Sequence, residues 1–205
     1  MHISWRALAI LLLAGGLPTR ASGQERERAW SIGLDVGLTR FWGGSEEVEP
    51  NGAPGFKPYR PTAAAVRVDR TIGRARVGLA VSYAASGLGL EGDNLTLIAK
   101  GGLTWIQVAP EVAYRLATLR AVTELRVFGG PVADLWIPDD EEGRTRIGVR
   151  GGAELLVPLS GWLACMLRAH AGLTGSLFRE ADVPSGFQPK TMPNVGLSLG
   201  IRFGL

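Results

Sequence analysis

The sequence has little cysteine, with Cys165 as the one copy among 205 residues. A lone cysteine excludes an internal disulfide and a zinc site built only from thiolates. A dominant charge is also missing, because 22 basic residues are interleaved with 19 acidic ones and the net charge is +3. This balance gives no basic face for nucleic acid. The apolar fraction of 46% excludes a disordered chain.

Long hydrophobic runs are absent as well. After Gln24 no stretch of 18 apolar residues occurs, which excludes transmembrane helices from that part of the sequence. The apolar run at residues 7–17 is too short to span a bilayer, follows Arg6 and precedes small residues at 21–23. This arrangement predicts a secretory signal peptide over residues 1–23 and a single mature domain over residues 24–205.

Glycine and alternating hydrophobicity are abundant instead. Glycine supplies 29 residues, about twice its average share. Leu34, Val36 and Leu38 alternate with Asp35 and Gly37. Because successive side chains of a strand point to opposite faces, this period of two predicts a β-strand with one apolar face. The same alternation occurs in eight segments: residues 30–42, 66–69, 76–83, 106–115, 124–127, 148–157, 163–174 and 195–205.

The connections between these segments alternate between long and short. The long ones cover residues 43–61, 85–103, 137–145 and 179–194, and the short ones cover 72–73, 117–118 and 159–161. Short periplasmic turns and longer external loops are typical of outer-membrane barrels. We therefore predict an all-β fold, an eight-stranded antiparallel up-and-down transmembrane β-barrel. Two arrangements are open within 85–103, because residues 95–98 either extend the fourth strand or form an extra hairpin with residues 87–90.

The apolar row of each strand is expected to face lipid and the small or polar row to face the lumen. Eight strands enclose little more than their own side chains, so no large pore is expected. Unpaired buried charges are costly, so we predict the ion pairs Asp35–Arg67, Glu111–Arg126 and Glu154–Arg168. The predicted structural charge network of the lumen comprises Asp35, Arg67, Asp69, Arg76, Glu111, Arg115, Arg120, Glu124, Arg126, Arg150, Glu154, Arg168, His170 and Arg202.

Aromatic residues near predicted strand ends form a second set. Outer-membrane barrels carry aromatic girdles at both membrane interfaces. The predicted girdle comprises Trp30, Trp42, Tyr83, Trp105, Tyr114, Trp136, Trp162, Phe178 and Phe203. The glycine pairs 101–102 and 129–130 predict bulges or bends where strands leave the bilayer.

The candidates for chemistry are few. His170 is predicted to face inward, and it is interpreted as an interior histidine close to Arg168 and Glu154. The acidic run at residues 139–142 offers oxygen atoms to a divalent cation but lacks the spacing of an EF-hand loop, so it is interpreted as solvated. Glu46, Glu47 and Glu49 are interpreted in the same way. No catalytic residue, metal site or cofactor is predicted.

The carboxyl terminus carries a recognisable pattern. Ser198 is followed by Gly200, and Phe203 and Leu205 occupy the antepenultimate and last positions. This pattern resembles the sorting signal of outer-membrane barrels, although many members end on an aromatic residue. With the signal peptide and eight strands, the chain resembles the small bacterial outer-membrane barrels related to the membrane domain of outer membrane protein A. The resemblance implies contact with outer-membrane lipid, insertion by the barrel-assembly machinery and periplasmic termini.

Three functional hypotheses follow. The first is a monomeric outer-membrane barrel with a plugged lumen, whose role is structural or consists of binding an unidentified ligand through its external loops. The second is a narrow channel for small or hydrophobic solutes. The third is a lipid A-modifying enzyme. One enzyme family of that kind uses an outward-facing histidine with a serine two residues later, whereas His170 is followed by Gly172 at that spacing.

Overall fold

The computed structural model describes residues 29–47, 55–92, 95–119, 122–139, 142–179, 185 and 187–205. The predicted signal peptide, residues 24–28 and Arg120 lie outside the described residues. No helix among the described residues is long and apolar enough to cross a membrane. These residues form the strands β1 (Trp30–Phe41), β2 (Gly44–Glu47), β3 (Gly55–Tyr59), β4 (Thr62–Ile72), β5 (Ala75–Gly92), β6 (Leu95–Leu119), β7 (Thr123–Pro138), β8 (Arg144–Pro158), β9 (Leu163–Thr174), β10 (Phe187–Lys190) and β11 (Met192–Gly204).

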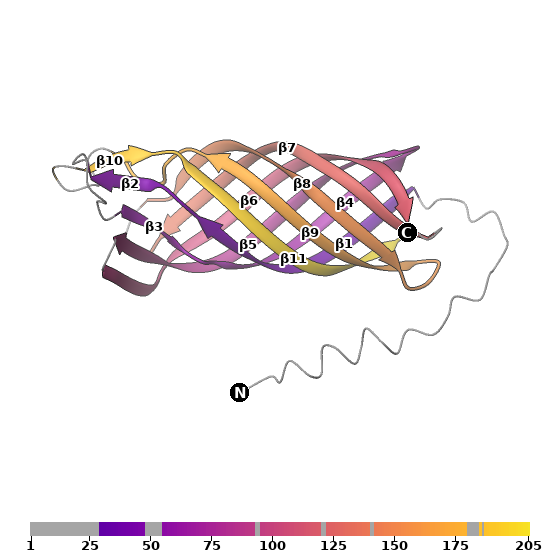
Figure 1. Cartoon of the computed structure of the whole chain (residues 1–205), viewed down its shortest axis with the longest axis horizontal. Helices are drawn as coiled ribbons and strands as arrows, with labels where there is room; N and C mark the ends of the chain where they lie inside the picture. The colour runs from indigo at the N-terminus through magenta and orange to yellow at the C-terminus, as the bar shows by residue number, and fades with distance from the viewer. Residues whose placement is uncertain are drawn as a thin grey trace, which may run out of the picture.

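Eight of the strands close into a ring. Each pairs antiparallel with the next in the order β1, β4, β5, β6, β7, β8, β9 and β11, and β11 pairs back onto β1. The ring is an elongated barrel with β2, β3 and β10 gathered at one end and the last residue near the other (Figure 1). Every strand of the ring therefore has a hydrogen-bonded neighbour on both sides, as a transmembrane barrel requires. The eight-stranded up-and-down barrel is confirmed.

The side chains of the barrel face outward and inward in strict alternation. Leu34, Val81 and Leu199 are 43%, 41% and 47% exposed on the outer surface. Asp35, which follows Leu34 on β1, is buried inside. The period of two in the sequence thus becomes an apolar outer wall around a polar lumen, the reverse of a water-soluble barrel.

The segment predicted as a loop over residues 85–103 is mostly strand. Beyond the ring, β5 and β6 stay paired from Leu88 with Ala99 to Gly92 with Leu95, after a register shift between Ser86 and Leu88. Residues 95–98 therefore extend their strand and also pair with the segment before them, so the two arrangements left open by the sequence are parts of one hairpin. The backbone ladder of the barrel continues past the wall because both strands still have a partner.

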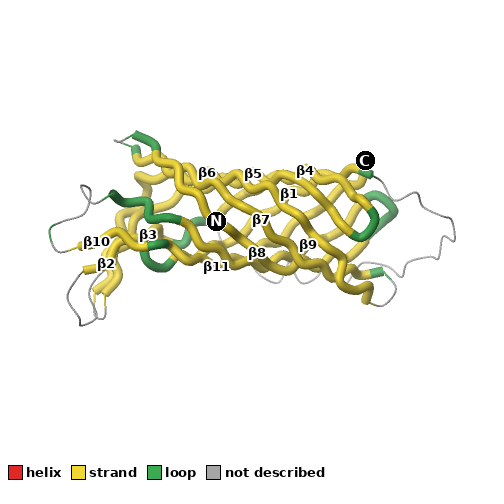
Figure 2. Tube along the Cα trace, turned by 90° about the horizontal axis from the view of Figure 1, so that it is seen from above, coloured by secondary structure: helices red, strands yellow, loops and turns green. Residues whose placement is uncertain are grey.

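Two further pairings lie at the same end. Beyond Thr62, the first residue of β4, the extension of β5 pairs with β3 instead. The strand β2 pairs with β10. Figure 2 shows these short strands projecting beyond the barrel wall. The end with the long connections is thus a folded platform of strands, whereas the opposite end carries short connections such as the turn at Gly73.

The two glycine pairs have different places. Gly102 has a left-handed backbone with φ 84° where β6 leaves the barrel, as predicted. Gly129 and Gly130 lie in the middle of β7, so the prediction that they mark an exit from the bilayer is wrong. Their neighbour Pro110 on β6 has no N–H to donate, and β6 passes very close to Gly130 at this point.

This close approach makes Gly130 sensitive to any side chain. We expect Gly130→Ala to lower the free energy of unfolding by about 1 to 3 kcal/mol, because its Cβ would overlap the carbonyl oxygen of Pro110. Gly33→Ala is the matched control, since its Cβ would lie 3.6 Å from the nearest atom, Cβ of Arg67. Urea unfolding in detergent, followed by tryptophan fluorescence, measures both variants. Equal loss of stability in the two would contradict this explanation.

Candidate functional site

The middle of the lumen is organised around Glu111 on β6. Its carboxylate lies 3.1 Å from Arg67 on β4, 2.6 Å from Arg150 on β8 and 2.9 Å from Arg168 on β9. Arg67 also contacts Asp35 on β1 at 2.7 Å. All five side chains are buried. One glutamate on β6 therefore bridges to three other strands, β4, β8 and β9.

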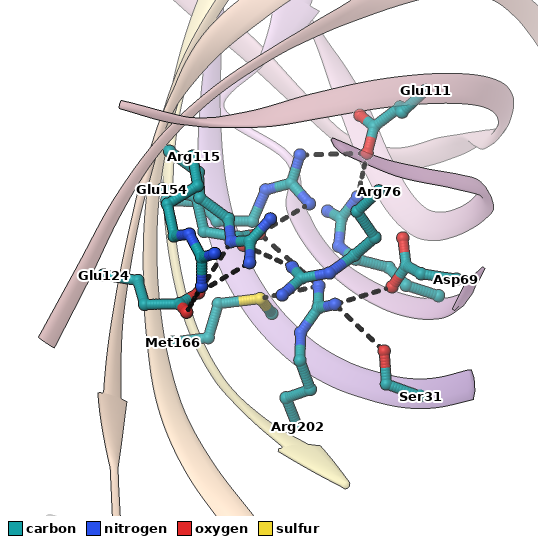
Figure 3. Close-up of polar contacts among 12 residues, drawn as sticks. Ser31, Asp69, Arg76, Glu111, Arg115, Glu124, Glu154, Met166 and Arg202 are labelled. Atoms are coloured by element: carbon teal, nitrogen blue, oxygen red, sulfur yellow. Dashed lines mark hydrogen bonds and ion pairs between the residues drawn. The ribbon is translucent and has the colours of Figure 1, made fainter. Parts of the chain in front are cut away.

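A second centre forms around Glu154 on β8. Its carboxylate lies 2.8 Å from Arg76, 3.3 Å from Arg168 and 3.5 Å from Arg202. Arg202 in turn lies 2.9 Å from Asp69. Figure 3 shows these side chains converging from several strands, with buried Met166 beside them. Because Arg168 contacts both glutamates, the two centres form one network, which we call the lumen network.

A third group lies toward the end of the barrel with the short turns. Glu124 contacts Arg115 at 2.9 Å and Arg126 at 2.7 Å, and its side chain is 23% exposed. A cavity of about 710 Å³ opens here, lined by residues that include Arg126, Arg202 and Trp162. The lumen is therefore hollow at this mouth and filled with paired charges deeper inside.

Two of the three predicted ion pairs are present, Asp35–Arg67 and Glu154–Arg168. The third was assigned wrongly, because Arg126 pairs with Glu124 while Glu111 contacts three other arginines. The β6–β7 register places Arg126 opposite Arg115, nearer the mouth than Glu111. The prediction considered only neighbouring strands, whereas an arginine side chain can reach across a barrel this narrow.

His170 lies inside the barrel, as the alternation predicts. It lines a small void together with Asp35, Arg67 and Arg150. A side chain at Gly196 on β11 would collide with the imidazole ring, so this glycine makes room for the histidine. Charged residues of the lumen thus lie beside His170, which also borders a groove of the outer wall together with Leu38 and Leu197. Most of the acidic candidates for cation binding lie outside the described part of the chain. These are residues 49, 140 and 141 and the side chains of Glu46 and Glu47.

The other end of the lumen is closed by aromatic rings. Phe41 packs edge-on against Trp105 and Trp136 at 5.5 and 5.4 Å between ring centroids, and the two indoles stack at 5.6 Å. All three are at most 2% exposed. We call these three rings, with Leu103 and Met192 packed against them, the aromatic cap.

A polar layer joins the aromatic cap to the lumen network. The Trp105 indole N–H donates a hydrogen bond of 2.9 Å to Asp134, and the amide of Gln107 donates one of 2.7 Å to the same carboxylate. Gln107 in turn accepts a hydrogen bond from Arg150. Polar contacts therefore connect the cap to Glu111, beside the small void that His170 lines.

The predicted girdle needs correction at three positions. Trp105 and Trp136 point into the lumen, and Phe178 packs against the aromatic cap and against Phe56. The assignment was wrong because it used only distance from the strand ends. The period of two already places Trp105 and Trp136 in the inward row. It places Phe41 and Asp134 there as well, and the sequence analysis did not include these two residues in the lumen.

The remaining girdle aromatics lie at the two ends of the outer wall. Trp30, Tyr114 and Trp162 are exposed at the end with the short turns, where Phe203 stacks on Trp162 at 5.9 Å. Trp42 and Tyr83 are exposed toward the other end. These six rings have the placement that a membrane with two interfaces requires.

No protein-family model and no curated protein matches the chain. Solved structures do match. Neisserial surface protein A has 8% identity and a TM-score of 0.57 over 86% of this chain and 97% of its own. OprG from Pseudomonas aeruginosa has 9% identity and a TM-score of 0.57 over 87% and 97%. The outer membrane protein AlkL has 10% identity and a TM-score of 0.55 over 92% and 94%. This chain therefore has the fold of the small outer-membrane β-barrel proteins.

Proposed function

We propose that this protein is an integral outer-membrane barrel with a closed lumen, whose role is structural or consists of surface interaction through its platform of external strands. The observation that carries the proposal is the continuous run of contacts that fills most of the lumen, from the aromatic cap through Gln107 to the network around Glu111 and Glu154. Buried ion pairs of this kind hold their partners in place, and side chains that meet across the lumen narrow the path open to water.

The orientation in the membrane follows from the lengths of the connections. Outer-membrane barrels have short turns in the periplasm and longer connections outside. The mouth near Glu124 then faces the periplasm, together with the first and last residues of the described barrel. The platform of β2, β3, β10 and the β5–β6 extension faces the outside of the cell. The outer wall between the aromatic ends contacts outer-membrane lipid. We propose that the barrel acts as a monomer, inserted by the barrel-assembly machinery.

Catalysis is not part of the proposal. A lipid-modifying site needs its base and nucleophile within reach of each other and of the lipid. His170 faces the lumen, and the residue two positions later is Gly172. The narrow-channel hypothesis remains the alternative, and conductance separates it from ours.

Single-channel recording tests the closed lumen. We expect barrels refolded in detergent and added to planar lipid bilayers to give no stable conductance steps, because the aromatic cap and the lumen network block the path for ions. The control is insertion itself, measured by the shift in electrophoretic mobility on boiling and by co-flotation with liposomes. Reproducible conductance steps from inserted wild-type barrels would overturn the closed lumen and favour the channel.

A further inference from the structure

Two arginines on the outer wall lie side by side below the external platform. Arg40 ends the exposed row of β1, and Arg60 lies between β3 and β4. The backbone N–H of Thr39 donates a hydrogen bond of 3.0 Å to the carbonyl of Pro61, which joins the two segments. Burial lowers the pKa of Lys57, and the nearby charges of Arg40 and Arg60 lower it further. Three cationic side chains therefore gather at one place on the surface.

Both guanidinium groups are held by aromatic rings. Arg40 lies over the ring of Trp42 at 5.3 Å, and Arg60 lies over the ring of Tyr59 at 5.5 Å. Stacking fixes a guanidinium by its face and leaves its N–H groups available at the edge. Within the part of the chain that the structure describes, neither arginine forms an ion pair with a carboxylate. Among the described residues, the pair thus presents organised donors that no carboxylate neutralises.

The two arginines border an apolar groove in the outer wall. The groove has a volume of about 650 Å³, and its lining includes Leu38, Val195, Leu197, Ala169 and Ala171. All five side chains are exposed outward, and the two alanines of β9 are the small ones that recess the wall. A cationic rim above an apolar floor matches a molecule with an anionic head and a hydrocarbon tail.

We propose that Arg40 and Arg60 bind the phosphate of an acylated, phosphorylated lipid of the outer leaflet, with one acyl chain in the groove along Ala169 and Ala171. Arginine recognises phosphate through paired, charge-assisted hydrogen bonds. The site rests on the proposed orientation, which places this end of the barrel at the outer leaflet. Lipid would then hold the base of the platform in a defined position.

Binding of diphosphorylated lipid A tests the site. The barrel is placed in phosphatidylcholine nanodiscs that contain a small fraction of this lipid, and bound lipid is counted by native mass spectrometry. We expect the double variant Arg40→Gln, Arg60→Gln to weaken binding by on the order of tenfold or more, because two charge-assisted contacts are lost. Ala169→Trp fills the groove without changing charge and should also weaken binding.

Arg70→Gln is the matched control, because Arg70 stacks over Trp30 at 5.8 Å near the opposite end of the wall. It should leave binding unchanged. Unaltered binding by the double variant, or an equal loss with Arg70→Gln, would overturn the proposal. Competition by inorganic phosphate together with normal binding by Ala169→Trp would also overturn it, since the site would then hold an anion and no lipid. A wild-type shift in electrophoretic mobility on boiling, measured in the same samples, shows that the variants still fold as barrels.

Discussion

Replacing Glu111 with glutamine is expected to lower the free energy of unfolding by about 3 to 5 kcal/mol, the usual cost of removing one partner from a buried ion pair. Glu111 neutralises Arg67, Arg150 and Arg168 at distances of 2.6 to 3.1 Å. A neutral amide leaves these three arginines crowded inside the barrel with Asp35 and Glu154 as the remaining buried carboxylates in contact with them. Urea unfolding in detergent gives the value.

Glu124→Gln is the control for this result. Glu124 also pairs with two arginines, but its side chain is partly exposed at the mouth. Water can solvate the arginines there, so the loss should stay within about 1 kcal/mol. A double variant, Glu111→Gln with Arg150→Gln, should recover part of the lost stability, because one uncompensated charge is removed with its partner. If Glu111→Gln unfolds at the wild-type urea concentration, the lumen network does not stabilise the barrel.

Replacing Trp136 with alanine is the second large effect. We expect a loss of about 3 to 5 kcal/mol, because truncating a buried aromatic side chain leaves a cavity that its neighbours fill only in part. Trp136 is fully buried, stacks on Trp105 and supports the edge of Phe41. Equilibrium unfolding monitored by circular dichroism measures the loss without relying on tryptophan fluorescence.

Trp162→Ala distinguishes burial in the lumen from a general need for tryptophan. Trp162 is 51% exposed on the outer wall and stacks on Phe203. Its replacement removes an interfacial ring and leaves the aromatic cap intact, so we expect the smaller loss. If Trp162→Ala proves as damaging as Trp136→Ala, closure by the aromatic cap is not a main source of stability.

The direction of each side chain could be predicted from the sequence, because alternation along a strand is a local property of the backbone. The alternation places Leu34 and Leu199 outward and Asp35, Glu111 and Glu154 inward without any reference to strand pairing. The same rule places Trp105 and Trp136 inside, whereas their distance from the strand ends wrongly indicates the membrane interface. Residue periodicity by itself therefore determined the apolar wall, the polar lumen and the number of barrel strands.

The partners of each side chain were decided only by the closed barrel. Glu111 contacts Arg67, Arg150 and Arg168 because ring closure brings β4, β8 and β9 within one arginine length of β6. The extension of β5 and β6 likewise depends on a register shift after Ser86. Closure and register are set by contacts between residues far apart in the chain, and a repeat of two residues carries no information about such distances.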